Sequence, residues 1–346
     1  MDGKTQMLDS CKFIKTILML TVIFGHGIAY WSGDWFIGTP RMPAPPLKLL
    51  FGWIGAFHTY GFALTSGYIF AFKMRSGGYK SYLKFIKNKA RRLILPYVFV
   101  AFLWVVPVSF CFFKWNINVI IHDFALGVNP HHLWFLLMLF EVFVLCWPLW
   151  PILTARGVKG AAAILIIFGM GAVLGKVLPN IYCIWTACGY IPFFYIGICM
   201  RCRQEDNMPN WIDKISVWKW VLIDIICYIV YISVQERSGI IGVLLRTSIG
   251  FLLHSVGAIM AFLVLYESAK RINWKNSRIF QALSVYSMPI YLFHQQLIYF
   301  TLTWFDGKVS PYFHVVLNFI FALLGSYTIS WVLMRYKFTR FLIGEK

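Results

Sequence analysis

Residues 13–31 read FIKTILMLTVIFGHGIAYW, an almost uninterrupted apolar run. A helix needs about 20 residues of this kind to cross the hydrocarbon core of a bilayer. Nine further runs of similar character follow at roughly 47–72, 93–113, 131–153, 160–178, 183–200, 216–234, 240–266, 284–304 and 311–334. The sequence therefore predicts an all-α fold, a polytopic integral membrane bundle of about ten transmembrane helices.

The composition supports the same fold class. Of the 346 residues, 60% are hydrophobic and 13% are charged, and the mean hydropathy is +0.69. These values exclude a disordered chain, a coiled coil and an ordinary soluble enzyme, and the runs lack the alternation of a membrane β-barrel. The connections are too short for a second soluble domain. We expect residues 1–346 to form one transmembrane domain without a soluble extracytoplasmic domain.

The basic residues indicate how the runs are oriented. If the N-terminus is cytoplasmic and the runs alternate, 25 of the 32 Lys and Arg residues lie inside. This asymmetry follows the positive-inside rule and predicts that both termini are cytoplasmic. The formal charge of +19 is then mostly a record of orientation, so we expect contact with membrane lipid and no nucleic-acid partner.

The first run contains two ionisable residues, Lys15 and His26. They are eleven residues apart, which is about three helical turns, so they share one helix face about 16 Å apart. Ionisable groups inside a membrane are expensive and mark functional sites. Neutral imidazole can abstract a proton at physiological pH. His26 is therefore our candidate base, with a structural hydrogen bond as the alternative.

Other polar residues interrupt later runs. Glu141 lies in the fourth run and could be a partner of His26, a proton relay or part of a buried ion pair. His294 precedes two glutamines in the ninth run, which forms a dense group of donors and acceptors. Asp224 and His254 are interpreted more simply as hydrogen bonds between helices. No arrangement of His and Cys predicts a metal site.

Segment 73–92 is the most basic stretch, with eight Lys and Arg residues and no acid. One interpretation is attraction to anionic lipid. The other is a site for a phosphorylated cytosolic ligand, formed by Lys89, Arg91 and Arg92 where the segment re-enters the membrane.

These residues resemble the bacterial membrane acyltransferase-3 family, the O-acyltransferases of surface polysaccharides. The resemblance covers nearly the whole chain and rests on five elements in the same order. They are Lys15 with His26, the stretch Phe62–Tyr68, the basic stretch Lys89–Tyr97, the stretch His132–Leu136 and the stretch Ser284–Gln295. The family often has Arg where this chain has Lys15 and Lys89.

The resemblance implies an O-acetyltransferase of the stand-alone type in the bacterial cytoplasmic membrane. It would move an acyl group, commonly acetyl, from cytosolic acyl-CoA to a hydroxyl of a surface or lipid-linked glycan. Acetyl-CoA would be the donor substrate, with no permanently bound cofactor. His26 would be catalytic, with Glu141 or His294 orienting it or carrying its proton.

The same resemblance suggests residues for binding. Lys15, Lys89, Arg91 and Arg92 would hold the CoA phosphates or line the entry of the donor. Ser66 and Trp134 would lie near the reacting carbonyl, where donors are required.

Two other functions fit a polytopic chain with buried ionisable groups. The first is a non-enzymatic transporter that exports a glycan or a lipid-linked intermediate. Such a protein should show paired halves or interrupted helices in matching positions, and the sequence has no such symmetry. The second is a structural subunit of an envelope complex, in which the polar residues would tolerate replacement by alanine.

The charge asymmetry gives a direct test of topology. Reporter fusions after residue 82 and after residue 346 should both report the cytoplasm, because the basic segments lie on that side. A periplasmic signal at either position would contradict the orientation, and segment 73–92 would then face no cytosolic ligand.

Overall fold

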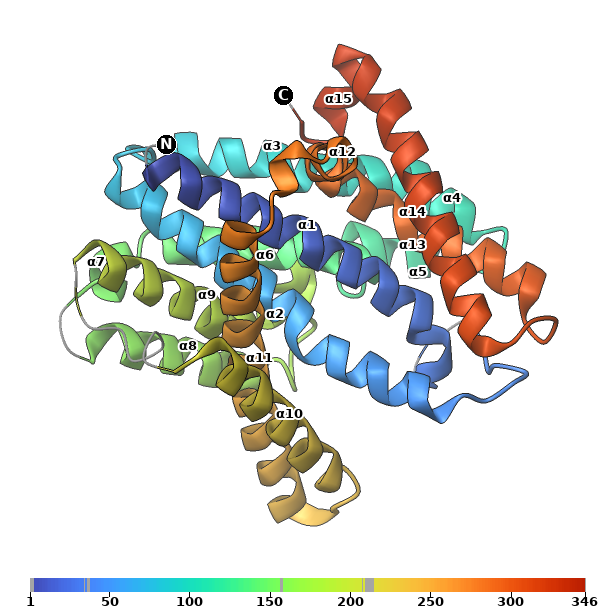
Figure 1. The fold of residues 1–346 in the computed structure, drawn as a ribbon, viewed down its shortest axis with the longest axis horizontal. Coiled ribbons are helices and arrows are strands. Elements are labelled where there is room, and N and C mark those ends of the chain that lie inside the picture. Colours follow the sequence, from blue (N-terminus) through green and yellow to red (C-terminus); the bar gives the residue numbers. More distant parts are fainter. Residues whose placement is uncertain are drawn as a thin grey trace. The chain divides into compact units, whose positions relative to one another are not determined.

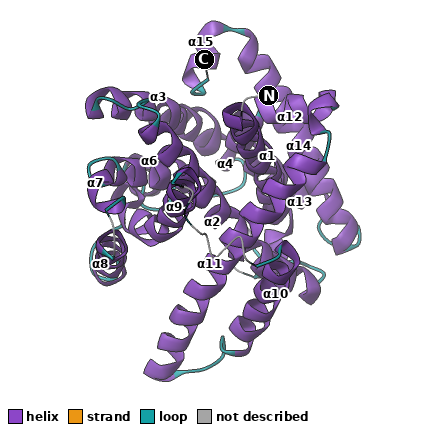
Figure 2. Ribbon diagram, turned by 60° about the vertical axis from the view of Figure 1, so that its left-hand side comes forward, coloured by secondary structure: helices purple, strands orange, loops and turns teal. Residues whose placement is uncertain are grey.

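Helices dominate the computed structural model of the chain (Figure 1). The structure describes residues 3–33, 35, 38–155, 158–206, 208 and 215–345. Within these ranges there is no strand (Figure 2), which confirms the all-α prediction. Arg156, Lys214 and Lys346, which enter the predicted charge split, lie outside the described residues, as does the side chain of Lys4.

Each of the ten predicted runs coincides with a helical segment. Among the described residues, five segments are long and apolar enough to cross a membrane: Thr5–Ser32, Tyr82–Ser109, Ile181–Glu205, Gly239–Arg271 and Pro311–Arg335. Two shorter apolar helices are His131–Cys146 and Lys159–Leu174. The number of ten spans stays a prediction.

The contacts divide the chain into two compact units, which are described separately. Unit 1 comprises Met1–Phe72 and Ile196–Val285, and unit 2 comprises Lys73–Tyr195 and Tyr286–Lys346. Helix α9 (Ile184–Glu205) contributes to both units.

The elements of unit 1 are α1 (Gly3–Ala29), η1 (Tyr30–Ser32), α2 (Pro45–Arg75, which ends just beyond the unit), α10 (Val217–Ser233), α11 (Gly239–Arg271), η7 (Trp274–Asn276) and α12 (Arg278–Val285). Those of unit 2 are α3 (Tyr82–Val100), η2 (Ala101–Val105), α4 (Val106–Ser109), α5 (Ile117–Val119), η3 (Ile120–Ala125), η4 (His131–Leu133), α6 (Trp134–Cys146), α7 (Trp150–Leu153), α8 (Lys159–Leu174), η5 (Ile181–Cys183), α13 (Ser287–Phe305), α14 (Pro311–Arg335) and α15 (Lys337–Leu342).

Unit 1 is organised around α1, which packs against α11 and α12. At one end of α1, the Asp9 carboxylate accepts a hydrogen bond of 2.6 Å from the Lys275 ammonium. Phe13 stacks on Phe280 with ring centroids 5.0 Å apart and lies 5.7 Å from Trp274. Helices α10 and α11 run side by side as a hairpin (Figure 1).

Unit 2 contains a second helix pair, α13 and α14, which pack against each other. The Thr301 hydroxyl of α13 donates a hydrogen bond of 2.6 Å to the side-chain oxygen of Asn318 in α14. Nε2 of His314 lies 3.0 Å from the Thr301 carbonyl oxygen. Side chains that bond across helices hold neighbouring helices together where no water is present.

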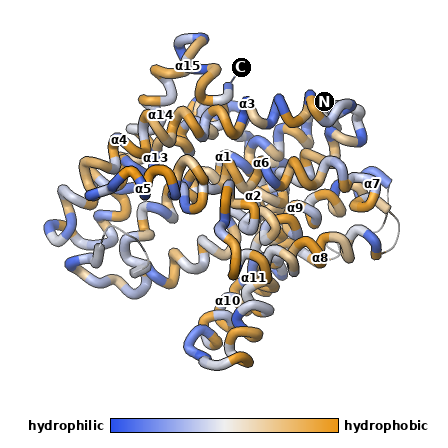
Figure 3. Tube along the Cα trace, turned by 180° about the vertical axis from the view of Figure 1, so that it is seen from behind, coloured by the Kyte–Doolittle hydropathy of each residue, from blue (hydrophilic) through white to orange (hydrophobic). Residues whose placement is uncertain are grey.

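Many large apolar side chains point away from the protein. Examples are Leu165 and Val173 of α8, Ile229 of α10 and Leu324 of α14, which are 59–66% exposed. Figure 3 shows hydrophobic residues along the helices and hydrophilic residues at turns such as the one that joins α10 to α11. A soluble protein rarely exposes so much apolar surface, whereas lipid tails are a suitable neighbour. The chain is a membrane protein.

A glycine sets the distance between α9 and α2 in unit 1. A methyl group at Gly197 would overlap the carbonyl oxygen of Leu64 and lie 2.8 Å from the backbone nitrogen of Tyr68. Only a residue without a side chain permits this approach of two helix backbones. The crossing falls on the Phe62–Tyr68 stretch that the sequence singled out.

Replacing Gly197 with alanine should therefore destabilise the protein by about 1–3 kcal/mol, because backbone atoms of α2 have to move. Gly189→Ala is the matched control on the same helix, since a methyl group there meets nothing within 4 Å. Thermal unfolding in detergent should give a lower Tm for Gly197→Ala and an unchanged or slightly higher Tm for the control. Equal Tm values for both variants would contradict the close crossing.

Candidate active site

His26 lies near the end of α1 and is half-buried. The chain folds back over this end of the helix. The Tyr30 hydroxyl donates a hydrogen bond of 2.9 Å to the carbonyl oxygen of Thr39. The indole N–H of Trp31 donates one of 3.1 Å to the carbonyl oxygen of Met42. These two bonds hold Thr39 and Met42 against the end of α1.

The returning segment also brings an aromatic ring to His26. The rings of His26 and Trp35 are nearly parallel, at 27°, with centroids 6.5 Å apart. At the position before His26, a methyl group on Gly25 would lie 3.2 Å from Cγ2 of Ile54, so α2 approaches α1 closely here. The imidazole thus sits in a packed, aromatic setting within unit 1.

Helix α1 runs without interruption from Gly3 to Ala29. Lys15 and His26 therefore share a helix face, as their spacing predicts. Both are half-buried, while Met19 and Val22, which lie between them on that face, are buried.

At the other end of α2, the guanidinium of Arg201 organises a polar group that we call the Arg201 cluster: Arg201, Tyr68, Phe72, Gln204 and Glu205. Arg201 donates to Glu205 at 2.5 Å and to the side-chain oxygen of Gln204 at 3.1 Å. Its guanidinium carbon lies 5.6 Å from the ring centre of Tyr68 and 5.0 Å from that of Phe72. The Tyr68 hydroxyl donates to the same oxygen of Gln204.

Two polar residues of unit 1, Asp224 and His254, join helices. The Asp224 carboxylate of α10 is fully buried and accepts a hydrogen bond of 2.8 Å from the indole N–H of Trp53 in α2. Nδ1 of His254 lies 3.1 Å from the carbonyl oxygen of Ala56, and its ring stacks on Tyr60 at 4.1 Å. Both contacts agree with the interpretation of these residues as links between helices.

In unit 2, hydrogen bonds join His132 of η4 to α13. The backbone N–H of His132 donates to the side-chain oxygen of Gln295 at 3.1 Å. Nε2 of His132 lies 3.0 Å from the carbonyl oxygen of Leu292, and the Tyr291 hydroxyl donates to the His132 carbonyl oxygen. Since a carbonyl oxygen only accepts, Nε2 carries the hydrogen and the neutral ring keeps Nδ1 as its basic nitrogen.

His294 is fully buried beside His132, with ring centroids 5.2 Å apart. Nδ1 of His294 lies 2.7 Å from the carbonyl oxygen of Tyr291, so its basic nitrogen is Nε2 by the same argument. Gln296 is also fully buried, and neither polar atom of its amide has a hydrogen-bond partner among the described residues. Two neighbouring imidazoles and a buried amide thus occur in η4 and one short stretch of α13.

The backbone near these groups has a strained conformation. His131, Tyr182 and Cys183 have φ values of 49°, 50° and 59°, a region that non-glycine residues seldom adopt. Tyr182 donates its N–H to the carbonyl oxygen of Leu126 at 2.8 Å, and Nδ1 of His131 lies 3.4 Å from the Tyr299 hydroxyl. Such strain accumulates at functional sites, where the surrounding structure holds it.

Two predicted residues lie on α6. Trp134 is the first residue of α6, and its ring contacts that of Tyr190 with centroids 5.4 Å apart. Glu141 is half-buried, and no hydrogen bond or ion pair joins it to another residue in the described part of the chain. His294 contacts His132, and the roles of Glu141 and His294 toward His26 stay predictions.

The predicted phosphate cluster lies on α3, and its three cations have different surroundings. The Lys89 ammonium is 3.4 Å from the ring centre of Phe143, 5.4 Å from that of Phe85 and 5.6 Å from that of Tyr79. An ammonium in contact with ring faces gains cation–π stabilisation. Lys89 is thus held by three aromatic rings.

Arg91 and Arg92 differ from Lys89. The Arg91 guanidinium carbon lies 5.9 Å from the ring centre of Phe341, and its buried Nε has no hydrogen-bond partner in the described residues. Arg92 is exposed. Burial raises the pKa of the Glu345 carboxyl, while the positive charge of Arg92 acts in the opposite direction. Arg92 is therefore the most accessible cation of the three.

Comparison with known proteins decides the family. The acyltransferase domain of the acyltransferase-3 type matches residues 9–335. The chain belongs to the acyltransferase-3 family. Neither a curated protein nor a solved structure matches it.

The predicted site residues of the acyltransferase lie in both units. Lys15, His26 and Ser66 belong to unit 1, where Ser66 is buried in α2 at the Gly197 crossing. Trp134, Glu141, His294 and the cluster of Lys89, Arg91 and Arg92 belong to unit 2. Within unit 2, the groups that the fold brings together are the two imidazoles of His132 and His294.

Several polar groups of the acyltransferase had no assigned role in the sequence. The sequence assigns no role to Arg201, although the i,i+4 spacing to Glu205 indicates a pair on one helix face. His132 belongs to the stretch His132–Leu136, but the sequence does not mark it as a site residue. Its bonds to Leu292 and Gln295 join positions 160 residues apart or more, and no local pattern predicts them.

Proposed function

We propose that this membrane acyltransferase moves an acetyl group from cytosolic acetyl-CoA to a hydroxyl of a surface or lipid-linked glycan in the bacterial cytoplasmic membrane. The observation that carries the proposal is the pair of Lys15 and His26 on one uninterrupted helix of a chain in the acyltransferase-3 family. The pair supports a donor that enters from the cytosol and reacts at a base within the membrane.

His26 is the proposed base. Its imidazole would take the proton of the sugar hydroxyl while the oxygen attacks the thioester carbonyl carbon. The tetrahedral oxyanion would need hydrogen-bond donors nearby, for which Ser66 and Trp134 are the proposed candidates. Collapse of the intermediate breaks the C–S bond, and the CoA thiolate takes the proton from the imidazolium to leave as the thiol.

The donor would be held through its phosphates. Lys89, Arg91 and Arg92 are proposed to bind them, because clustered cations and the planar guanidinium group suit phosphate oxygens. The exposed Arg92 is best placed for this role, whereas the Lys89 ammonium is already in contact with Phe143. Lys15 is proposed to contact the same ligand or line its entry.

Two experiments test this function. Purified protein in lipid nanodiscs, supplied with labelled acetyl-CoA and a glycan fraction from the host envelope, should transfer the label to the glycan. Mass spectrometry of the surface glycan with and without this chain identifies the acyl group and the acceptor. Absence of transfer in the first experiment, together with an unchanged glycan in the second, would contradict the proposal.

His26→Gln tests the proposed base. Gln keeps a hydrogen-bonding group but cannot accept a proton at neutral pH, so transfer should fall by roughly 10²–10⁴-fold with little change in Tm or CoA affinity. Acetyl transfer, thermal unfolding and CoA binding are measured on the same preparation. If His26 is only structural, the Gln variant stays active, and His26→Ala loses stability and activity together. Trapping of acetylated enzyme without an acceptor distinguishes a base from a residue that carries the acyl group.

Replacing all three cations of the α3 cluster with neutral residues should raise the KM for acetyl-CoA. Among single variants, Arg92→Gln should raise it more than Lys89→Gln, because Arg92 is exposed and the Lys89 ammonium faces aromatic rings. Each charge-assisted bond is worth about 1.5–3 kcal/mol, so a loss of about tenfold in apparent affinity is expected. Unchanged kinetics in the triple variant would reduce the cluster to an orientation signal.

A further inference from the structure

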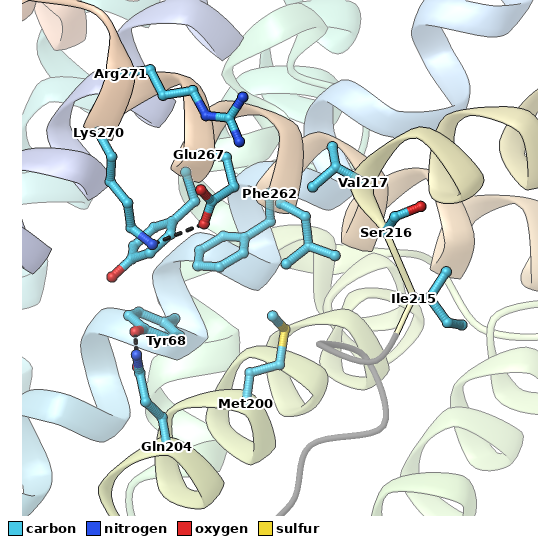
Figure 4. Close-up of a pocket in the computed structure, with 12 residues that line it drawn as sticks. Tyr68, Met200, Gln204, Ile215, Ser216, Val217, Phe262, Glu267, Lys270 and Arg271 are labelled. Atoms are coloured by element: carbon cyan, nitrogen blue, oxygen red, sulfur yellow. Dashed lines mark hydrogen bonds and ion pairs between the residues drawn. The ribbon is translucent and has the colours of Figure 1, made fainter.

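Unit 1 contains a pocket of about 390 Å³ that none of the predicted site residues lines. It is formed by the ends of four helices, with Tyr68 from α2, Met200 and Gln204 from α9, Val217 from α10, and Phe262 to Arg271 from α11 (Figure 4). The volume falls in the range of small-molecule sites. The predicted orientation places all four helix ends on the cytoplasmic side.

One wall of the pocket is aromatic. Phe262 and Tyr266 lie one turn apart on α11 with nearly parallel rings, at 17° and 5.4 Å between centroids. The Tyr68 ring contacts Phe262 at 5.0 Å and Tyr266 at 6.3 Å. The Arg201 cluster holds Tyr68 in place, since its hydroxyl is bonded to Gln204 and the Arg201 guanidinium lies over its ring. Tyr68 and Phe262 are buried, so Tyr266 is the ring of this wall that stays accessible, and an accessible aromatic ring suits a planar heterocycle.

The rim of the pocket is charged and carries both signs. The Lys270 ammonium donates to the Glu267 carboxylate at 2.8 Å and lies 4.6 Å from the ring centre of Tyr266. Figure 4 shows the Arg271 guanidinium on the same side of the pocket as Glu267. Arg271 and Lys270 are exposed. A guanidinium binds phosphate oxygens through paired N–H groups, and a carboxylate accepts hydrogen bonds from ribose hydroxyls.

We propose that this pocket binds the adenine nucleotide end of the acyl donor, with the base against Tyr266 and the ribose phosphate on Arg271. The identity of the ligand as CoA rests on the function proposed above. A phosphate alone, as in a lipid headgroup, would match the cations of the rim but not the aromatic wall or the carboxylate. A phosphorylated nucleoside matches all three features.

Arg271→Ala is the principal test, with Arg278→Ala as the matched control. Arg278 is an exposed cation of the same unit that does not line the pocket. Binding of adenosine 3′,5′-bisphosphate, CoA and dephospho-CoA to the purified protein is measured by calorimetry. The wild type and the control should prefer CoA over dephospho-CoA, which lacks the ribose 3′-phosphate. Arg271→Ala should bind CoA about tenfold more weakly and lose most of that preference.

A second variant tests the aromatic wall. Tyr266→Leu keeps an apolar side chain but removes a ring face, so it should weaken CoA and dephospho-CoA by the same factor, about tenfold. Equal affinities of Arg271→Ala and Arg278→Ala for all three ligands would overturn the proposal. Displacement of the bisphosphate by vesicles containing phosphatidylglycerol, but not by CoA, would also overturn it and assign the pocket to a lipid headgroup.

The outcomes separate this proposal from the function on which it rests. If labelled acetyl is transferred and Arg271→Ala binds CoA like the control, the pocket assignment fails and the acyltransferase function stands. If no acetyl is transferred but the bisphosphate binds through Arg271, the pocket is a nucleotide site and acetyl-CoA is not the donor.

Discussion

The absence of water from the hydrocarbon core governs this structure. Backbone groups in lipid have to bond within their own segment, so the chain crosses as helices. The same requirement extends to side chains. Asp224 accepts from Trp53, Thr301 donates to Asn318, and Nε2 of His132 lies at a carbonyl oxygen of α13. Each pair satisfies a polar group that would otherwise be costly in an apolar medium. Apolar side chains, by contrast, are free to point outward, as those of α8 and α10 do.

The exceptions to this requirement are therefore informative. Gln296 has a fully buried amide that bonds to no described residue, and His131, Tyr182 and Cys183 adopt left-handed backbone conformations nearby in the same unit. An unbonded buried amide and a left-handed backbone both cost free energy, so they persist only where the surrounding structure holds them in place. The neighbouring imidazoles of His132 and His294 each commit one nitrogen to a carbonyl oxygen of α13 and keep one basic nitrogen. Unit 2 thus contains two neighbouring imidazoles whose tautomers are fixed by the backbone of α13.

Aromatic rings have a second role in this protein, since they hold its cations. Lys89 lies over Phe143, and Arg201, which is also paired with Glu205, lies near the rings of Tyr68 and Phe72. A ring face stabilises a positive charge without supplying a counter-ion, which suits a chain with 32 basic and only 13 acidic residues. A cation held in this way is fixed in position. It is also less free to bind a ligand than an exposed one such as Arg92 or Arg271.

The sequence by itself determined the class of fold, the positions of the helical segments and the family. These follow from the length of apolar runs and from short motifs, and both are local properties of the chain. The shared face of Lys15 and His26 also follows from spacing, because a continuous helix has a fixed period. Only the tertiary structure decided which polar groups meet. Neither the contact between His132 and His294 nor the one between Trp53 and Asp224 can be predicted from either segment alone, since each joins helices far apart in the chain. The pocket at the ends of α2, α9, α10 and α11 has the same origin. Its lining comes from four segments that become neighbours only when the helices pack.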